Sequence, residues 1–305
     1  VGLMKFKQIV VLDYLTFTPE SLEALSGLCE GEIKVYEDDP KDVNSVISRI
    51  GEADCVLTSW RSEINSEVIE ACSNLKYIGV CATSVTKVDL SACSKKGIVV
   101  TNVRDYGDEG VVEWIFYELL CLIRGLGKYQ WKSDKVNELA GKTFGIIGLG
   151  VLGKMVAKAA LGFNMNVVYY SRTRNNEFEN KGCKYLPKKE LLKLSDFISL
   201  QIPRDLKILD KSDFDLMKEK VLINNVIGEA FLKKDFLQWV SKENNFAIMD
   251  RSPSIDFFDS FLGVDRVIMR DLISGRTEEC FTRLSNKSIE NIKAYLSSKV
   301  INQVK

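Results

Sequence analysis

One glycine pattern constrains the fold of this chain more than any other feature. Gly148, Gly150 and Gly153 form a G-x-G-x-x-G pattern that directly follows the apolar stretch 143–147 and opens a helical stretch, 154–161. In such a strand–turn–helix unit the first glycine permits a tight turn, the second allows a pyrophosphate to approach the backbone, and the third lets the helix pack on the strand. The pattern predicts a Rossmann domain that binds a nicotinamide dinucleotide at the start of the helix; a glycine-rich turn kept only for packing is the alternative. The predicted contacts are Gly148, Leu149, Gly150, Val151, Leu152 and Gly153.

The residues that follow the second strand of this unit, 167–170, indicate which dinucleotide binds. About 20 residues beyond the glycines, NAD-binding domains usually carry an Asp or Glu that binds the ribose 2′-hydroxyl. This chain has Ser171 there, followed by Arg172, Thr173 and Arg174. A carboxylate would repel a 2′-phosphate, whereas a hydroxyl beside guanidinium groups can bind one through charge-assisted hydrogen bonds. The sequence therefore favours NADP over NAD as the cofactor, and a solvated basic loop without a ligand is the alternative.

Apolar or β-branched runs alternate with amphipathic stretches on both sides of a long apolar helix, 109–124. This alternation predicts parallel sheets with crossover helices, and 305 residues exceed what a single core usually accommodates. We expect an α/β fold in which 1–102 and 279–305 form a flavodoxin-like substrate domain and 103–278 forms the Rossmann cofactor domain. The stretch 278–304 has a helical pattern and should return to the first domain. The expected strands are 8–12, 33–36, 55–59, 75–80, 98–103, 143–147, 167–170, 197–200, 221–224, 246–249 and 267–269.

The composition argues against several classes of function. Lys plus Arg and Asp plus Glu both total 42, so there is no overall charge that would attract nucleic acid. No apolar run approaches the about 20 residues of a membrane span. The 8 cysteines include no C-x-x-C pair, which favours a reducing cytoplasm, and the start of the chain has no secretory pattern. His is absent, which excludes zinc hydrolases and Ser-His-Asp enzymes in their usual forms, and we expect no metal site.

Beyond the glycine pattern, the chain resembles the D-isomer-specific 2-hydroxyacid dehydrogenase family over nearly its full length. The stretch 75–90 is similar to the family's substrate-loop signature, and 96–103 to its crossing into the cofactor domain. The stretch 200–203, Leu-Gln-Ile-Pro, resembles a cofactor-lining segment in which the family carries His at the second position. The resemblance implies a substrate loop at Ala82, Thr83 and Ser84, and further cofactor contacts at Pro203, Val226 and Asp250.

The same resemblance identifies what the chain lacks. Family enzymes reduce 2-keto acids with an Arg that binds the substrate carboxylate and a His, tuned by a Glu, that transfers the proton. The Arg position is Ile227 and the His position is Leu272, while the Glu position offers Ile255, with Asp256 one residue out of register. Loss of the Arg should severely weaken 2-keto acid binding, and loss of the proton donor alone costs about 10²- to 10⁴-fold in rate. The polar candidates left around the implied cleft are Tyr106, Lys87, Arg104 and Asp271.

Three functions remain open at this point. The leading hypothesis is an NADPH-dependent oxidoreductase with a non-standard site, whose small-molecule substrate is a less charged carbonyl or unsaturated compound and not a simple 2-keto acid. The main alternative is a catalytically silent dinucleotide-binding regulator or a noncatalytic partner subunit. The third, a degenerate fold without a cofactor, is disfavoured by the conventional glycine spacing.

The long apolar helix also suggests an assembly. Its stretch 111–122 is apolar over more of its circumference than one core-facing side requires, so we expect a homodimer. Burial of this helix within one chain is the alternative.

Overall fold

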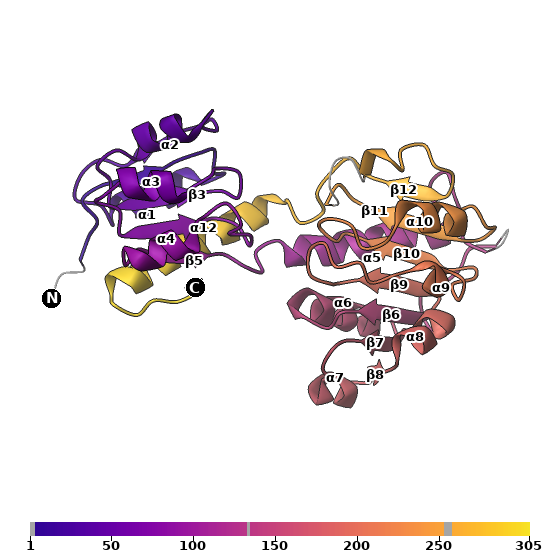
Figure 1. Ribbon diagram of the computed structural model, residues 1–305. Helices are drawn as coiled ribbons and strands as arrows, with labels where there is room; N and C mark the ends of the chain where they lie inside the picture. Colours follow the sequence, from indigo (N-terminus) through magenta and orange to yellow (C-terminus); the bar gives the residue numbers. More distant parts are fainter. Residues whose placement is uncertain (1–3, 133–134, 253–257) are drawn as a thin grey trace. The chain divides into compact units, whose positions relative to one another are not determined.

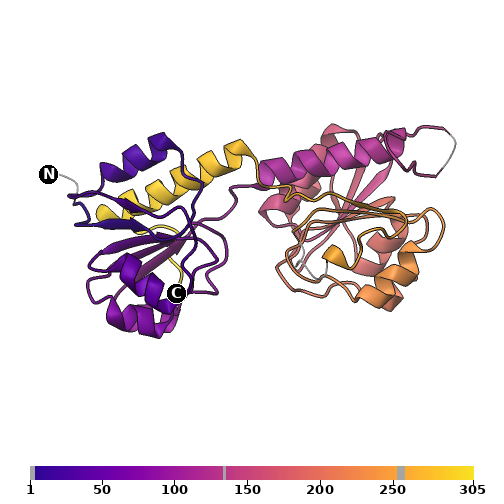
Figure 2. The same ribbon diagram turned by 90° about the horizontal axis from the view of Figure 1, so that it is seen from above.

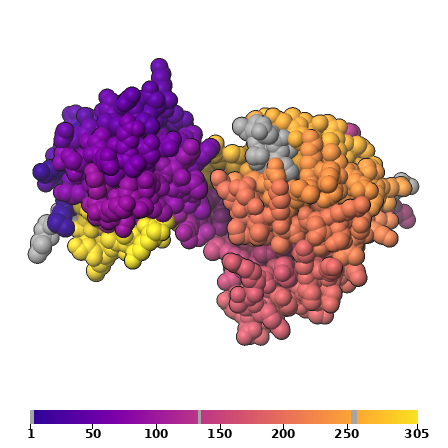
Figure 3. Space-filling model, in the orientation of Figure 1, coloured from indigo at the N-terminus to yellow at the C-terminus, as the bar shows by residue number. Residues whose placement is uncertain are grey.

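The computed structural model describes residues 4–132, 135–252 and 258–305, which divide into two units. The first unit comprises Val1–Tyr106 with Thr277–Lys305, and the second comprises Gly107–Arg276. Each unit is a parallel sheet with helices on both faces (Figure 1). The C-terminal segment lies against the N-terminal part of the chain in the first unit (Figure 3). The expected α/β class with two parallel sheets is confirmed.

The first unit has the strand order β2-β1-β3-β4-β5, and all neighbouring strands are parallel. This is the flavodoxin-like order. Helices α1 and α12 pack on one face, and α2, α3 and α4 on the other (Figure 2), so the central strands are buried on both sides. The strands are β1 Ile9–Val11, β2 Lys34–Val35, β3 Cys55–Thr58, β4 Tyr77–Val80 and β5 Val99–Asn102, and the helices are α1 Pro19–Ser26, α2 Val43–Ile50, α3 Ser66–Ala71, α4 Leu90–Lys95 and α12 Glu278–Leu296.

The helices of this unit begin where the sequence provides a capping side chain. Thr18, Asp42, Asn65, Asp89 and Thr277 each accept a hydrogen bond from a backbone N–H in the first turn of the helix that follows. Such a cap satisfies one of the N–H groups that the first turn leaves without a partner. Short polar residues between the apolar runs therefore set the positions of these helices.

The C-terminal helix is shorter than its pattern predicts. Helix α12 ends at Leu296 and does not continue to 304. Ser298 adopts a left-handed conformation with φ 56°, and the N–H of Lys299 donates to the carbonyl of Ala294 at 2.8 Å, which closes the helix end. The remaining residues run beside β5, where Gln303 forms an antiparallel bridge with Thr101.

The second unit has the strand order β12-β11-β10-β9-β6-β7-β8, again parallel throughout. The order reverses between β6 and β9, and in such sheets ligands bind at the carboxyl ends of the strands at this reversal. The predicted Rossmann fold is confirmed, and β8 is an additional two-residue strand at the edge of the sheet that was not predicted. The strands are β6 Thr143–Ile147, β7 Asn166–Tyr170, β8 Lys184–Tyr185, β9 Phe197–Leu200, β10 Val221–Asn224, β11 Phe246–Met249 and β12 Val267–Met269, and the helices are α5 Asp108–Arg124, α6 Val151–Gly162, α7 Asn176–Asn180, α8 Lys188–Leu194, α9 Lys211–Phe214 and α10 Lys233–Val240.

Helix α5 is packed within the second unit. Its buried side chains belong to one core cluster with α6 and β6, in which Phe116 stacks on Phe144 and on Phe163 with ring centroids 5.6 and 5.2 Å apart. Trp114 is also buried, whereas Tyr117, at 59% exposed, faces solvent. The apolar side chains around α5 therefore pack against other residues of the same chain. The apolar surface of α5 is thus explained by contacts within one chain, and the homodimer stays a prediction.

Candidate dinucleotide site

The glycine turn between β6 and α6 contains two kinds of glycine. Gly148 has φ +102°, and a Cβ built on it would lie 1.9 Å from the Gln201 carbonyl oxygen. A Cβ on Gly153 would lie 2.1 Å from the Gly148 carbonyl oxygen. A Cβ on Gly150 would meet no atom within 4 Å. Packing therefore explains Gly148 and Gly153 but not Gly150, whose missing side chain leaves open space at the position where the motif places a pyrophosphate.

The start of α6 is chemically suited to that anion. Gly150 is the N-cap, so no side chain caps the first turn. Leu149 is buried, Leu152 is half-buried, and Val151 is 52% exposed. An uncapped helix start combines free N–H groups with the positive end of the helix dipole. The predicted contacts from Gly148 to Gly153 thus form one turn whose shape and polarity fit a dinucleotide pyrophosphate.

The two arginines that follow β7 differ in their partners. Arg174 forms an ion pair with Glu179 and lies 5.4 Å from the ring centroid of Tyr185. Hydrogen bonds from Arg174 and from Tyr169 hold the pKa of the Glu179 carboxyl below its usual value, so this ion pair is charged at neutral pH.

Arg172 is exposed and has no ion-pair partner among the residues that the structure describes. The Ser171 hydroxyl donates to the carbonyl of Thr173, which is also exposed. Of the two guanidinium groups, Arg172 is therefore the one available to a ligand.

Polar side chains also gather at the carboxyl ends of β9 and β10. The Gln201 amide donates to the Ser199 hydroxyl at 2.8 Å and to the Asn225 side-chain oxygen at 3.2 Å. The Asn224 side-chain oxygen accepts from the N–H of Val226 at 3.2 Å, while its buried Nδ2 has no acceptor. Pro203 is exposed and Val226 is buried. A buried amide without an acceptor is rare in proteins, and here it occurs beside the strand reversal.

Asp250 holds two loops in place. Its carboxylate is fully buried at the end of β11 and accepts four hydrogen bonds, of 2.6 to 2.9 Å, from the N–H and hydroxyl groups of Ser252 and Ser274. The sequence did not single out either serine, because Ser274 lies 24 residues from Asp250 and no local pattern connects them. Asp250 thus fixes the segment that follows β12, and a cofactor carboxamide would have to share its oxygens with these donors.

The two residues that the resemblance implies for the Arg and His positions, Ile227 and Leu272, are apolar and accessible. Ile227 follows β10 and is 47% exposed, and Leu272 follows β12 and is 44% exposed, so both lie at the carboxyl edge of the sheet. Asp271 pairs with Arg251. The candidates for the Glu position, Ile255 and Asp256, lie outside the described residues.

The other predicted site residues belong to the first unit. Tyr106 packs beside the core cluster that contains α12, and its carbonyl accepts from Arg283 at 2.8 Å. Arg104 and Lys87 are exposed, and their carbonyls accept hydrogen bonds from Lys287 and Ile64. The backbone of each of these residues is therefore held in place by a hydrogen bond within the first unit.

The implied substrate loop follows β4 in the same unit. Ala82 is buried, Thr83 is exposed and Ser84 is half-buried. The Asn102 amide donates to the Thr83 carbonyl at 2.7 Å, which holds the loop on β5.

The described residues contain no group of three or more His, Cys, Asp or Glu side chains placed to hold a metal ion. None of their helices has both the length and the apolar character that crossing a membrane requires.

The fold and the glycine turn define a dinucleotide-binding oxidoreductase scaffold, and comparison with known proteins specifies the family. Residues 122–251 match the family model described as "D-isomer specific 2-hydroxyacid dehydrogenase, NAD binding domain". A hydroxypyruvate reductase of Blautia hydrogenotrophica is 31% identical over 97% of this chain and 99% of its own length. A glyoxylate reductase of Pyrococcus furiosus is 26% identical over 87% of this chain and 86% of its own length. The chain belongs to the D-isomer-specific 2-hydroxyacid dehydrogenase family of oxidoreductases.

Solved structures agree with this assignment. An acyclic imino acid reductase in complex with NADPH and D-Arg has a TM-score of 0.82 at 27% identity, covering 98% of this chain and 100% of its own. A D-2-hydroxyisocaproate dehydrogenase has a TM-score of 0.82 at 17% identity, covering 97% of this chain and 99% of its own. At that identity the second likeness concerns the fold alone.

Proposed function

We propose that this chain is an NADPH-dependent reductase whose substrate is not a simple 2-keto acid. The observation that carries the proposal is the pair of accessible apolar side chains, Ile227 and Leu272, at the positions implied for the substrate-binding Arg and the proton-donating His. An aliphatic side chain can neither pair with a carboxylate nor donate a proton. The expected substrate therefore lacks the carboxylate of a 2-keto acid and needs no histidine.

The unpaired guanidinium of Arg172 supports NADPH over NADH. Arg174 is engaged by Glu179, so a 2′-phosphate would be bound by Arg172, and the Ser171 hydroxyl would join it by exchanging its hydrogen bond to the Thr173 carbonyl for one to the phosphate. The structural relative that binds NADPH supports the same choice. NADH remains the alternative cofactor.

The missing proton donor favours a C=N substrate over a C=O substrate. A bound reduced nicotinamide would supply a hydride to a carbon atom of the substrate. A ketone then needs a proton for its oxygen, whereas a protonated imine already carries that proton and becomes a neutral amine. The chain has no His, and Asp271 is paired with Arg251. The similarity to an imino acid reductase supports the same preference.

A matched pair of ring compounds tests this proposal. 1-Pyrroline and cyclopentanone have similar size and no carboxylate, but only 1-pyrroline is a protonatable imine. With NADPH we expect loss of absorbance with 1-pyrroline and none with cyclopentanone. Faster turnover of cyclopentanone would contradict the preference for C=N.

The rival function is a catalytically silent dinucleotide-binding protein, either a regulator or a noncatalytic partner subunit. It is favoured by the engagement of the polar groups nearest the apolar positions, Asp250 by serines and Asp271 by Arg251. Tight NADPH binding without oxidation by any carbonyl or imine would support it.

Three wider expectations belong to the same proposal. The substrate would be held by the loop of Ala82, Thr83 and Ser84 in the unit that also contains the C-terminal helix. The scattered cysteines favour the reducing cytoplasm. The family resemblance favours a homodimer, which light scattering tests, since a mass of 34.4 kDa would mean a monomer.

A further inference from the structure

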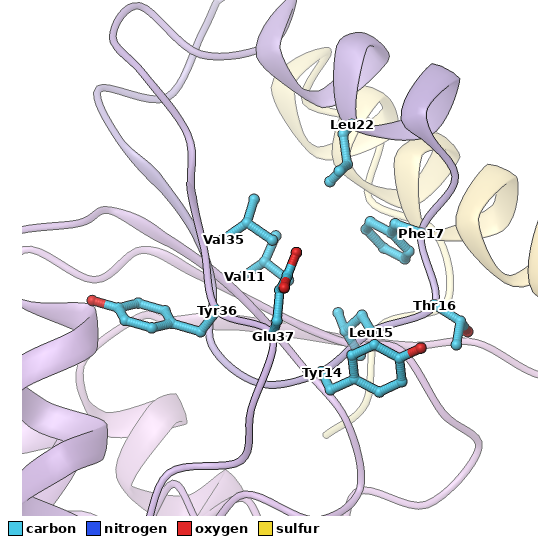
Figure 4. Close-up of a pocket in the computed structure, with 9 residues that line it drawn as sticks. All are labelled: Val11, Tyr14, Leu15, Thr16, Phe17, Leu22, Val35, Tyr36 and Glu37. Atoms are coloured by element: carbon cyan, nitrogen blue, oxygen red, sulfur yellow. The ribbon is translucent and has the colours of Figure 1, made fainter.

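A separate pocket of about 300 Å³ opens in the flavodoxin-like unit (Figure 4). It lies at the carboxyl ends of β1 and β2, next to the β1/β3 reversal at which sheets of this order bind ligands. Its volume is at the lower end of the range of small-molecule sites, about 300–1,000 Å³. The lining residues are Val11, Tyr14, Leu15, Thr16, Phe17, Leu22, Val35, Tyr36 and Glu37.

The pocket contains one carboxylate that its surroundings do not neutralise. The chain has three acids in succession after Tyr36, of which Asp38 pairs with Arg49 at 2.9 Å and Asp39 with Arg61 at 2.8 Å. Glu37 has no cationic partner among the described residues. Its side chain extends between Val35 and Phe17 (Figure 4). The two arginines thus pair with Asp38 and Asp39 and leave Glu37, an exposed side chain that lines the pocket, without a cationic partner among the described residues.

Hydrogen bonds from the same arginines fix the walls of the pocket. Arg49 donates to the Leu12 carbonyl at 3.0 Å, and Arg61 donates to the Tyr14 carbonyl at 2.7 Å. The N–H of Tyr36 donates to the Val11 carbonyl at 3.0 Å. These bonds join the loop after β1 to the loop after β2. A site whose walls are already ordered loses less conformational entropy on binding.

We infer that this pocket binds a small organic cation, a primary ammonium carried on an apolar body. The apolar body would lie on Phe17, Leu22 and Val35, and the ammonium would pair with Glu37. The rings of Tyr14 and Phe17 offer faces that attract a cation. An anion would be repelled by Glu37. The inference is independent of the proposed reductase activity, because none of these residues belongs to the dinucleotide site or to the substrate loop.

Benzylamine and benzyl alcohol are probes that differ in charge and share the apolar body. We expect nuclear magnetic resonance titration at low ionic strength, without NADPH, to give benzylamine about two- to fivefold tighter binding than benzyl alcohol, the range of an exposed ion pair. Glu37→Gln should remove this difference. Glu32→Gln is the matched control, since Glu32 is an exposed acid on the segment before β2 outside the pocket, and it should retain the difference.

A second variant, Val35→Lys, tests the inference independently if Glu37→Gln fails to fold. Val35 lies on the edge strand β2 and is 41% exposed, so Val35→Lys should fold normally while placing its own ammonium beside Glu37. Folding is checked by its thermal unfolding midpoint, and benzylamine binding should fall about two- to fivefold. The inference is overturned if benzyl alcohol binds the unaltered protein as tightly as benzylamine, or if Glu32→Gln weakens binding as much as Glu37→Gln.

Discussion

Gly148 lies so close to Gln201 that a Cβ added to the glycine would be 1.9 Å from the backbone carbonyl oxygen of Gln201. The two residues follow β6 and β9, the strands between which the sheet order reverses. Gly148 is therefore required for packing. Gly150 is not, because a Cβ there would meet no atom within 4 Å, and its role is instead to leave space for a ligand.

The glycines give a matched pair of variants. Gly148→Ala should lower the free energy of unfolding by about 2–4 kcal/mol, because it adds a backbone clash and a positive φ at a non-glycine residue. Gly150→Ala should change it by less than about 0.5 kcal/mol but weaken NADPH binding at least about tenfold, by occupying the space for the pyrophosphate. Chemical denaturation and titration calorimetry measure the two effects. Equal effects of both variants on stability would contradict this division of roles.

The two arginines after β7 provide a test of cofactor selectivity. Arg172→Ala should weaken NADPH binding by about 1.5–3 kcal/mol, the contribution of a charge-assisted hydrogen bond, which is roughly 10- to 150-fold. NADH binding should be unchanged. Arg174→Ala is the control, because its guanidinium is already paired with Glu179. Calorimetry at fixed ionic strength measures all three proteins; an equal loss with NADH would show that Arg172 does not contact the 2′-phosphate.

Asp250 should be important for stability. Asp250→Asn replaces a buried carboxylate that accepts four hydrogen bonds, and we expect a loss of about 2–4 kcal/mol. Asp271→Asn is the control, since it removes an exposed ion pair with Arg251 and should cost about 0–1 kcal/mol. Urea unfolding compares them. Similar losses for both variants would mean that the serine contacts of Asp250 contribute little.

Stability should fall at high pH through a buried thiol. Burial raises the pKa of Cys81 from 9.0 to about 12. Because the folded state holds this proton more tightly than the unfolded chain, the resulting stabilisation is complete below pH 9.0 and is lost as the pH rises towards about 12. Cys81→Ala should reduce the slope of stability against pH in that window. An unchanged slope in Cys81→Ala would refute the assignment.

Local patterns in the sequence predict much of this fold. The glycine turn, the long apolar helix and the longer strands each show a period or a motif within a few residues. The end of α12 is different, because it depends on the left-handed conformation of Ser298. The difference between Arg172 and Arg174 is also absent from the sequence, since it depends on where the Glu179 side chain lies. Contacts between segments far apart, such as Asp250 with Ser274, leave no local pattern at all.

The most direct test of the central claim is the rate of hydroxypyruvate reduction with NADPH. The relative that is 31% identical over 97% of this chain is named hydroxypyruvate reductase. Hydroxypyruvate is therefore the 2-keto acid that gives the strictest test of the proposal. Because we propose that Ile227 and Leu272 occupy the positions of the carboxylate-binding and proton-donating residues, we predict no turnover above background. A turnover number typical of enzymes, about 10 per second, would contradict the account and show that other residues bind the carboxylate and donate the proton.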